Sequence, residues 1–417
     1  MEIERPAYLS KLLDARGNGQ AKVVTGVRRC GKSFLVFTLF KRALLERDVP
    51  ADHIIEMAFD DFEGKPYRDP SVFYPFVKDK IADKQTYYLL LDEVQLLDDF
   101  VDVLNGFLHK GNVEIYVTGS NARLLSKDIA TEFRGRGDEI RLAPLSFSEF
   151  MSAYTGDKRE GYLEYSVYGG LPAVALLDSP SKKSDYLRKL FDEIYLCDIV
   201  ERNRIKNAEN LDELVDVLAS SIGSLTNPLK LSNTFKTVKH TPMSPQTVSA
   251  YIEALEDSFL IEEAARYDVK GRRYIGSPQK YYFCDPGLRN ARLNFRQTEE
   301  THLMENIVYN ELRARGFAVD VGVVPARRRD DSGAYRRTQL EIDFVCNKGN
   351  ERCYVQSAYA LPTEKKLQQE QAPFAQVDDS FRKVIVSKEG VAPHYDDHGT
   401  LMMNIYDFLL DPASLSL

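Results

Sequence analysis

The sequence predicts an α/β fold whose first third is built on a parallel sheet. Short apolar runs of the kind that form buried strands occur at residues 21–26, 54–59, 87–91 and 113–118, and residues 139–142 are a fifth candidate. Helical stretches separate these runs. Strands that alternate with helices usually pair in parallel, with helices covering both faces of the sheet.

Length and charge narrow the class of protein further. The chain has 417 residues, whereas a single core rarely grows beyond about 250–300 residues, so we expect two to four domains. The 55 basic and 63 acidic side chains leave a net charge of −8. Because proteins that live on nucleic acid usually carry a basic face, any such face here must be local.

The cysteines and the N-terminus indicate the compartment. The cysteines Cys30, Cys197, Cys284, Cys346 and Cys353 are odd in number, widely spaced and without a C-x-x-C pair, which argues against a disulfide framework. Cys346 and Cys353 could meet across adjacent strands, although we favour two small buried residues. With no apolar signal segment and no run of about 18 apolar residues, we expect a soluble cytoplasmic protein that makes no membrane contact.

A glycine-rich loop follows the first strand run. Residues 26–33 read Gly-Val-Arg-Arg-Cys-Gly-Lys-Ser and match G-x-x-x-x-G-K-[ST] at every fixed position, between a strand and a helix. The glycines let several N–H groups face one anion, the lysine adds charge, and the serine hydroxyl can bind Mg²⁺. The alternative is a glycine turn that happens to precede a lysine, but the context favours nucleotide. The expected contacts are Gly26, Arg28, Arg29, Cys30, Gly31, Lys32, Ser33 and Phe34.

Two carboxylates end the third strand run. Asp92 and Glu93 follow the apolar residues 87–91. We expect Asp92 to hold Mg²⁺ through water and Glu93 to orient and deprotonate the attacking water. Two adjacent acids at a buried strand end repel each other unless a cation is near. A solvated strand terminus is the simpler alternative.

Further polar residues follow the fourth strand run. Ser120 or Asn121 could touch the γ-phosphate or the water, and a helix cap explains either residue nearly as well. Arg134 and Arg136 lie in a glycine-rich turn, where an arginine finger could reach phosphate in the same subunit or in a neighbour. A surface turn is an equally good explanation of these arginines.

The middle of the chain has the element order of a winged helix. Three helical stretches precede two strand runs that surround a turn at Gly271. The third helix, residues 245–257, carries no Arg or Lys, which disfavours sequence reading in a DNA groove. The basic residues of the wing are Lys270, Arg272, Arg273 and Lys280, and these could contact DNA or RNA phosphates. Packing within the protein, which would couple the ATP state to the C-terminal part, is an equally good reading.

Several motifs in fixed order resemble AAA+-type ATPases of bacteria and archaea, especially an uncharacterised group often named simply "ATP-binding protein". The stretches are TGVRRCGKS, YYLLLDEVQLL, VTGSNARLLS, FRGRGDEIRLAPLSFSEF, YGGLPAV and LCDIVERN, and further similarity continues almost to the C-terminus. The resemblance implies an AAA+ P-loop sheet that binds ATP and Mg²⁺. It implies that Lys32 and Ser33 are the Walker-A pair and that Asp92 and Glu93 are the Walker-B pair. It also implies a sensor role for Ser120 or Asn121, and it makes Arg134 and Arg136 the candidates for the arginine finger.

The last part of the chain resembles the PD-(D/E)xK nuclease fold. That fold gathers a divalent metal with acids from a helix and two strands, and uses a lysine beside them. Glu305 and Asp343, with Glu341 on the same strand face, match the first acids. Gln356 stands where the next acid belongs and Ala358 where the lysine belongs, so we expect an inactive relative. The alternative is that the three acids are ordinary solvated side chains.

The predicted domains are an AAA+ core at 1–150, a helical lid at 151–207, a winged helix at 208–290 and a small mixed α/β nuclease-like domain at 291–417. Three functions compete: an ATPase that drives or gates a conformational change in the later domains, an ATP-switched nucleic-acid-binding regulator with slow turnover, and an ATP-dependent nuclease. Glu93 favours the first, whereas Gln356 and Ala358 disfavour the third. A protein partner and an oligomer are both compatible with the sequence.

Overall fold

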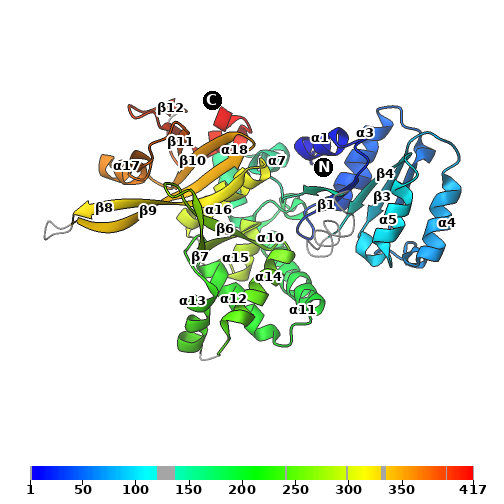
Figure 1. Cartoon of the computed structure of the whole chain (residues 1–417), viewed down its shortest axis with the longest axis horizontal. Coiled ribbons are helices and arrows are strands. Elements are labelled where there is room, and N and C mark those ends of the chain that lie inside the picture. Colours follow the sequence, from blue (N-terminus) through cyan, green and yellow to red (C-terminus); the bar gives the residue numbers. More distant parts are fainter. Residues whose placement is uncertain are drawn as a thin grey trace. The chain divides into compact units, whose positions relative to one another are not determined.

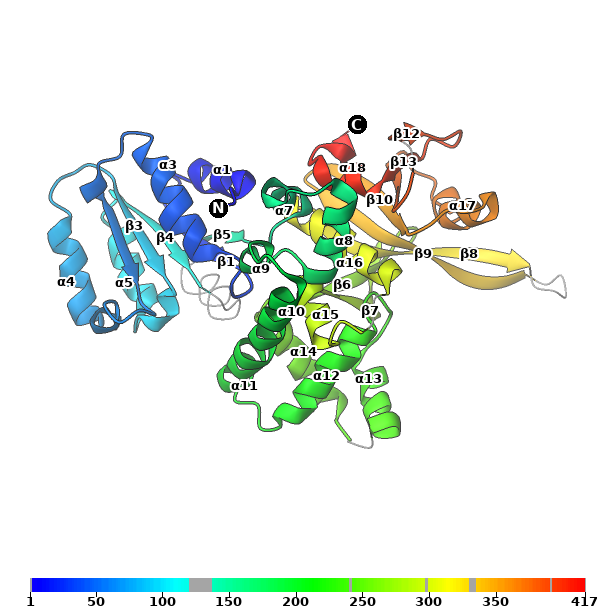
Figure 2. The same ribbon diagram turned by 180° about the vertical axis from the view of Figure 1, so that it is seen from behind.

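The chain forms two compact units. The computed structural model describes residues 2–119, 137–239, 242–296, 299–329, 335–390 and 392–416. The first unit comprises Met1–Pro144 with Asp257–Phe259, and the second comprises Leu145–Glu256 with Leu260–Leu417. Figures 1 and 2 show both units from opposite sides, each with a sheet of its own.

The first unit is built on a five-stranded parallel sheet, as the alternation of strand and helix predicts. The strand order is β2-β3-β4-β1-β5, and every neighbouring pair is parallel. Because β1 lies between β4 and β5, the loop that follows β1 begins in the interior of the carboxyl edge of the sheet. The strands are β1 (Ala21–Thr25), β2 (Ile54–Ala58), β3 (Tyr87–Asp92), β4 (Val113–Thr118) and β5 (Gly137–Arg141).

Helices cover both faces of this sheet, and alternate residues of a strand face opposite layers. Val117 belongs to the core that Phe73 of α4 and Phe107 of α5 complete. The preceding residue, Tyr116, packs on the other face, with its ring centroid 4.3 Å from that of Phe40. The described helices are α1 (Pro6–Asp14), α2 (Lys32–Phe34), a π-helical turn (Leu35–Phe40), α3 (Lys41–Leu45), α4 (Pro70–Lys80) and α5 (Phe100–Leu108).

The second unit begins with a run of helices. A π-helical segment, Leu190–Leu196, joins α10 to α11, and another, Phe235–Lys239, extends α13. The helices are α7 (Phe147–Ala153), α8 (Lys158–Tyr168), α9 (Pro172–Ala175), α10 (Pro180–Lys189), α11 (Cys197–Arg202), α12 (Ala208–Ser220), α13 (Pro228–Thr234), α14 (Pro245–Asp257), α15 (Pro286–Arg292), α16 (Glu300–Ala314), α17 (Glu364–Gln371) and α18 (Ile405–Leu410).

The YGGLPAV stretch has a structural explanation. Gly169, with φ of 74°, ends α8, and a Cβ there would lie 2.0 Å from a carboxylate oxygen of Asp285. That carboxylate accepts the Gly170 N–H at 2.7 Å and caps α15 by accepting the Leu288 N–H at 3.0 Å. The two glycines therefore let the backbone approach a buried acid that connects α8 to α15.

The second unit also contains a mixed eight-stranded sheet, visible in Figures 1 and 2. Its order is β12-β13-β11-β10-β9-β8-β6-β7. The helices and the hairpin expected of a winged helix are present, but the hairpin β6–β7 continues into this sheet because β6 pairs in parallel with β8. The strands are β6 (Ile261–Asp268), β7 (Arg273–Phe283), β8 (Ala318–Arg329), β9 (Tyr335–Lys348), β10 (Glu351–Ala358), β11 (Arg382–Ser387), β12 (His394–Tyr395) and β13 (Leu401–Asn404).

The cysteines agree with the simpler expectation for them. All five cysteines are free. Cys346 and Cys353 are opposite one another in the antiparallel register of β9 and β10, and both are buried. Among the described residues, no helix combines the length and the apolar character needed to cross a bilayer.

Candidate functional site

The loop after β1 turns at two glycines that the structure requires. Gly26 has φ of 141° and Gly31 has φ of 100°, both in the region that favours glycine. A Cβ on Gly26 would lie 2.2 Å from the carbonyl oxygen of Leu142, which follows β5. The helix then starts with the Leu35 N–H donating to the Gly31 carbonyl at 2.9 Å. The backbone therefore follows the strand, turn and helix that the motif predicts.

Lys32 places its ammonium group against this loop. The residue is only 5% exposed, and its Nζ donates to the carbonyl oxygens of Gly26 at 2.9 Å and Val27 at 3.1 Å. Both acceptors belong to the loop itself. The loop thus carries its own buried cation, as a loop that surrounds phosphate needs.

The other predicted loop contacts differ in exposure. Cys30 is buried, and its Sγ donates to the Leu142 carbonyl at 3.5 Å. Arg29 and Phe34 are exposed, and Arg28 is half-buried. Cys30 therefore fixes the loop to the chain after β5, whereas direct nucleotide contact by these four residues stays a prediction.

Three segments meet at the carboxylate of Asp92, the last residue of β3. Thr118, the last residue of β4, donates its hydroxyl to Asp92 Oδ1, and the Ser33 side chain also hydrogen-bonds this carboxylate. Burial raises the pKa of Asp92; the two hydroxyl groups oppose this rise, and the charges of Glu93 and Asp60 add to it. A nearby cation would favour the ionised form of such a carboxyl group.

Glu93 occupies a turn directly after this strand. Its φ of 49° is left-handed, and its backbone N–H donates to Thr118 Oγ1 at 3.2 Å. Its carboxylate accepts a hydrogen bond from the side-chain amide of Gln95. The single hydroxyl of Thr118 therefore fixes the backbone of Glu93 and the carboxylate of Asp92 together.

The donor atoms at this edge suit a hard divalent cation. A hydroxyl and a carboxylate are the protein ligands that Mg²⁺ takes in P-loop proteins, and those of Ser33 and Asp92 are in hydrogen-bond contact. No group of three His, Cys, Asp or Glu side chains in the described ranges could hold a metal by itself. A cation bound here would therefore share its coordination with phosphate oxygens or water.

Four predicted site residues fall in a stretch that the structure does not describe. Ser120, Asn121, Arg134 and Arg136 lie outside the described residues, so their roles as sensor and finger stay predictions.

Two residues that sequence reasoning missed complete this region. Thr118 could have been found, because it ends a predicted strand in the same way as Asp92. Arg5 gave no signal, since it precedes every recognisable motif. Its guanidinium is buried and donates to the carbonyl oxygens of Ala143 at 2.8 Å and Cys30 at 3.4 Å. Arg5 thereby links the N-terminal segment to both the glycine-rich loop after β1 and the chain after β5.

A second group of acids lies in the second unit. Lys280 Nζ lies 2.8 Å from carboxylate oxygens of both Glu305 on α16 and Glu341 on β9. Burial disfavours the charge on Lys280, but Glu305, Asp343 and Glu341 outweigh that effect and raise its pKa. Glu305 and Asp343 are each only 8% exposed. These two acids are therefore not ordinary solvated side chains, and the group contains its own cation.

Gln356 and Ala358 have clear roles of their own on β10. The Gln356 amide oxygen accepts the Asp343 N–H at 3.3 Å, and its amide nitrogen donates to Glu370 at 3.0 Å. Ala358 is buried in an apolar core. Gln356 thus acts as a hydrogen-bonding bridge, and Ala358 as packing.

The basic residues predicted for a nucleic-acid contact divide into three kinds. Lys270 and Arg272 are exposed in the β6–β7 turn, and Arg273 lies 3.7 Å from Asp268. The prediction for Lys280 was wrong, because this residue is buried and ion-paired within the unit. Lys270, Arg272 and Arg273 are therefore exposed cations, whereas Lys280 is not.

The comparisons with known proteins agree with the first unit. Residues 18–151 match a family model described as an AAA domain, and residues 159–299 match a domain of unknown function, DUF8612. The α/β fold with its five-stranded parallel sheet is consistent with a P-loop AAA-type domain. An AAA-type domain indicates ATP binding and hydrolysis.

Two relatives and one solved structure, from three organisms, are similar to this chain. The S. cerevisiae Hsp104-ADP complex is 14% identical, with 76% of this chain and 43% of that chain covered and a TM-score of 0.32. Uncharacterized protein MJ1544 of Methanocaldococcus jannaschii is 27% identical over 361 residues, covering 83% of this chain and 76% of the relative. An uncharacterized protein of Haemophilus influenzae is 34% identical over 391 residues, covering 92% of this chain and 93% of the relative. With an AAA domain at its start and similarity along nearly its whole length, this chain belongs to the family of the Haemophilus influenzae protein.

Proposed function

We propose that the first unit binds ATP together with Mg²⁺ and hydrolyses it. The observation that best supports this function is the meeting of Ser33, Asp92 and Thr118, which come from three different segments. Such a convergence at the carboxyl edge of a parallel sheet is where α/β proteins bind ligands.

Each residue has a role that follows from its chemistry. The loop amides and the Lys32 ammonium would hold the phosphates, and Ser33 and Asp92 would hold the cation. When bound, Mg²⁺ supplies positive charge that offsets charge developing on the phosphate oxygens. Glu93 would take the proton of the attacking water, and its position is set by the hydrogen bond from its backbone to Thr118.

The remaining assignments come from the sequence. Ser120 or Asn121 would contact the γ-phosphate or the water, and Arg134 or Arg136 would act as the arginine finger. A glycine-rich turn leaves an arginine free to reach phosphate in its own subunit or in a neighbouring one.

Hydrolysis in the first unit would drive or gate a conformational change in the second. The helices α12 to α14, the β6–β7 hairpin and the region after α15 would receive that change, and the exposed Lys270 and Arg272 allow it to act on nucleic acid. Nuclease activity is disfavoured, because Lys280 occupies the acid group and Ala358 cannot act on water. A regulator that binds DNA and turns ATP over slowly would differ by showing turnover that rises when DNA is added.

Phosphate release from ATP with Mg²⁺ tests the assignment. Glu93→Gln should lower kcat about 10²-fold or more, the usual contribution of a general base, while ATP still binds. Lys32→Ala should weaken ATP binding itself. Measuring turnover and ATP binding for both variants separates the two roles.

Glu46→Gln is a matched control, since Glu46 is an exposed acid that follows α3. It should turn over ATP as the parent does. If Glu93→Gln behaves like this control, Glu93 is not the base; if the parent protein binds no ATP with Mg²⁺, the proposed function fails altogether.

A further inference from the structure

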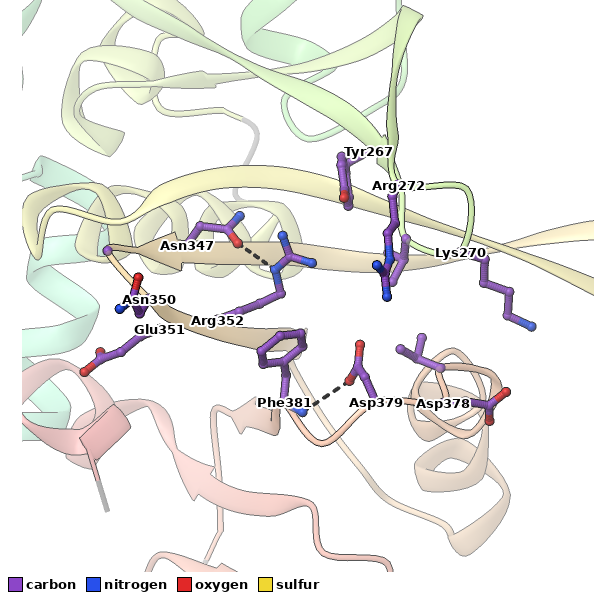
Figure 3. Close-up of a pocket in the computed structure, with 13 residues that line it drawn as sticks. Tyr267, Lys270, Arg272, Asn347, Asn350, Glu351, Arg352, Asp378, Asp379 and Phe381 are labelled. Carbon is purple, nitrogen blue, oxygen red and sulfur yellow. Dashed lines mark hydrogen bonds between the residues drawn. The ribbon is translucent and has the colours of Figure 1, made fainter.

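A pocket of about 560 Å³ opens on the second unit, far along the chain from the glycine-rich loop after β1. Three segments line it: the β6–β7 turn, the β9–β10 turn and the stretch that leads into β11. Figure 3 shows charged and aromatic side chains from all three segments facing a common space. The volume falls within the range of about 300–1,000 Å³ typical of small-molecule sites.

One wall of the pocket is a fixed arginine. Arg352 donates from Nε to the Asn347 amide oxygen at 2.6 Å. Its guanidinium lies 5.6 Å from the ring centroid of Tyr267 and 5.3 Å from that of Phe381. Figure 3 shows this guanidinium between the two rings. A guanidinium held between two rings keeps its orientation, so the wall is pre-formed.

Two further cations lie at the same pocket without a protein partner. Lys270 and Arg272 are exposed, and within the described part of the chain neither makes a hydrogen bond or an ion pair, whereas Arg273 beside them is near Asp268. On a protein with a net charge of −8, a local group of unpaired cations indicates an anionic ligand. Phosphate is the anion that Arg and Lys bind most often in nucleic-acid ligands.

An aromatic ring and two acids favour a base beside that phosphate. Phe381 is 39% exposed although its ring borders the pocket, and exposed aromatic rings are platforms on which bases stack. Asp379 is fixed by accepting the Tyr354 hydroxyl at 2.6 Å and the Phe381 N–H at 3.2 Å. Asp378 and Asp379 could accept hydrogen bonds from the amino group of a base. Their charge also disfavours the dense phosphates of a duplex.

We propose that this pocket binds one nucleotide unit whose base carries an amino group, with the phosphate on Arg272 and Lys270 and the base on Phe381. The unit could be a free nucleoside monophosphate or part of a single strand. This site is separate from the proposed ATP site, so either one can be correct without the other.

The test uses the full chain with Lys32→Ala, which weakens binding at the loop after β1. Calorimetry with AMP and anisotropy with labelled ten-nucleotide strands of adenine or of thymine, at low salt, report binding. We expect the adenine ligands to bind better than the thymine strand. Phe381→Leu should weaken binding about tenfold, the order found for the loss of one stacking platform. Arg272→Gln should weaken binding by a similar factor, because it removes one charged hydrogen bond to the phosphate.

Phe62→Leu and Arg337→Gln are matched controls, because both residues are exposed and neither lines the pocket. Binding of AMP would identify a free nucleotide as the ligand, and binding of the strand alone would identify single-stranded nucleic acid. The proposal is overturned if no ligand binds, or if the pocket variants and the controls weaken binding equally. Thermal unfolding of each variant shows that the fold is intact.

Discussion

The two units each gather carboxylates at the carboxyl edge or the face of a sheet, but they balance the charge differently. In the first unit, the hydroxyl groups of Ser33 and Thr118 bond Asp92, and the charges of Glu93 and Asp60 repel it. In the second unit, a lysine ammonium contacts two carboxylates at once, and a third carboxylate lies near it.

The carboxylates of the first unit therefore need an added cation to balance their charge, whereas those of the second unit have a cation of the protein beside them. Neutral hydroxyl groups lower the cost of a buried carboxylate but leave its charge in place, so Asp92 still gains from an added cation. Lys280 supplies that charge permanently in the second group. A divalent ion would have to displace a buried, doubly paired ammonium from the acids.

Replacement of Lys280 by methionine should have the largest effect. Lys280→Met leaves Glu305, Glu341 and Asp343 close together without their cation, and loss of one partner of a buried ion pair costs about 3–5 kcal/mol. Chemical denaturation should show this loss in the free energy of unfolding. Changing Glu305 to glutamine in the same chain should recover part of it.

Lys183→Met is the matched control in the same unit. Lys183 is also buried, but its partner is the single, partly exposed Glu164. The control should lose less stability because only one carboxylate is left unpaired and water reaches it. An equal loss in both variants would show that Lys280 has no special role in the second group of acids.

Replacement of Thr118 by valine should have a smaller effect, on turnover. Thr118→Val keeps the side-chain shape but removes the hydroxyl that bonds Asp92 and accepts the Glu93 N–H. We expect kcat for ATP to fall about ten- to a hundredfold and the required Mg²⁺ concentration to rise, since one charged hydrogen bond is worth roughly 1.5–3 kcal/mol. Thr38→Val, a substitution in the π-helical turn, should change neither quantity. An unaltered Mg²⁺ dependence in Thr118→Val would separate Thr118 from the cation.

The first of these regions was largely readable from the sequence, because its signals are local. Gly26, Gly31 and Lys32 are within one short motif, and Asp92 directly follows an apolar run. The sheet order was not readable, since β1 lies between β4 and β5, which are distant from it in the sequence. The contact between Ser33 and Asp92 follows from that strand order, and no local pattern around either residue indicates it.

Lys280 shows why the second region was harder to predict. From the sequence we predict it, with Lys270, Arg272 and Arg273, to be a cation of an exposed wing around the turn at Gly271. The strand β7 in fact runs from Arg273 to Phe283, and its burial changes along its length from exposed to buried. Only the pairing of β6 with β8, about 50 residues away, brings α16 and β9 against that buried end. A parallel pair of strands that are far apart in the chain leaves no pattern in the local sequence.

Asp285 offers the smallest effect and a third way to keep an acid buried. Backbone N–H groups are its principal partners, and burial raises its pKa to about 6, against about 3.9 for an unfolded aspartate. A raised pKa means that the folded chain binds the proton more tightly, so stability is highest at low pH and is lost as pH rises through about 6. Between pH 7 and pH 5 the parent should therefore gain about 1 kcal/mol relative to Asp285→Asn, which has no proton to bind. Unfolding curves at the two pH values measure this difference. Comparing the parent with the variant cancels the contributions of all other titrating groups. Parallel shifts in both proteins would mean that Asp285 keeps an ordinary pKa and that the N–H groups of Gly170 and Leu288 stabilise its charge as effectively as a cation does.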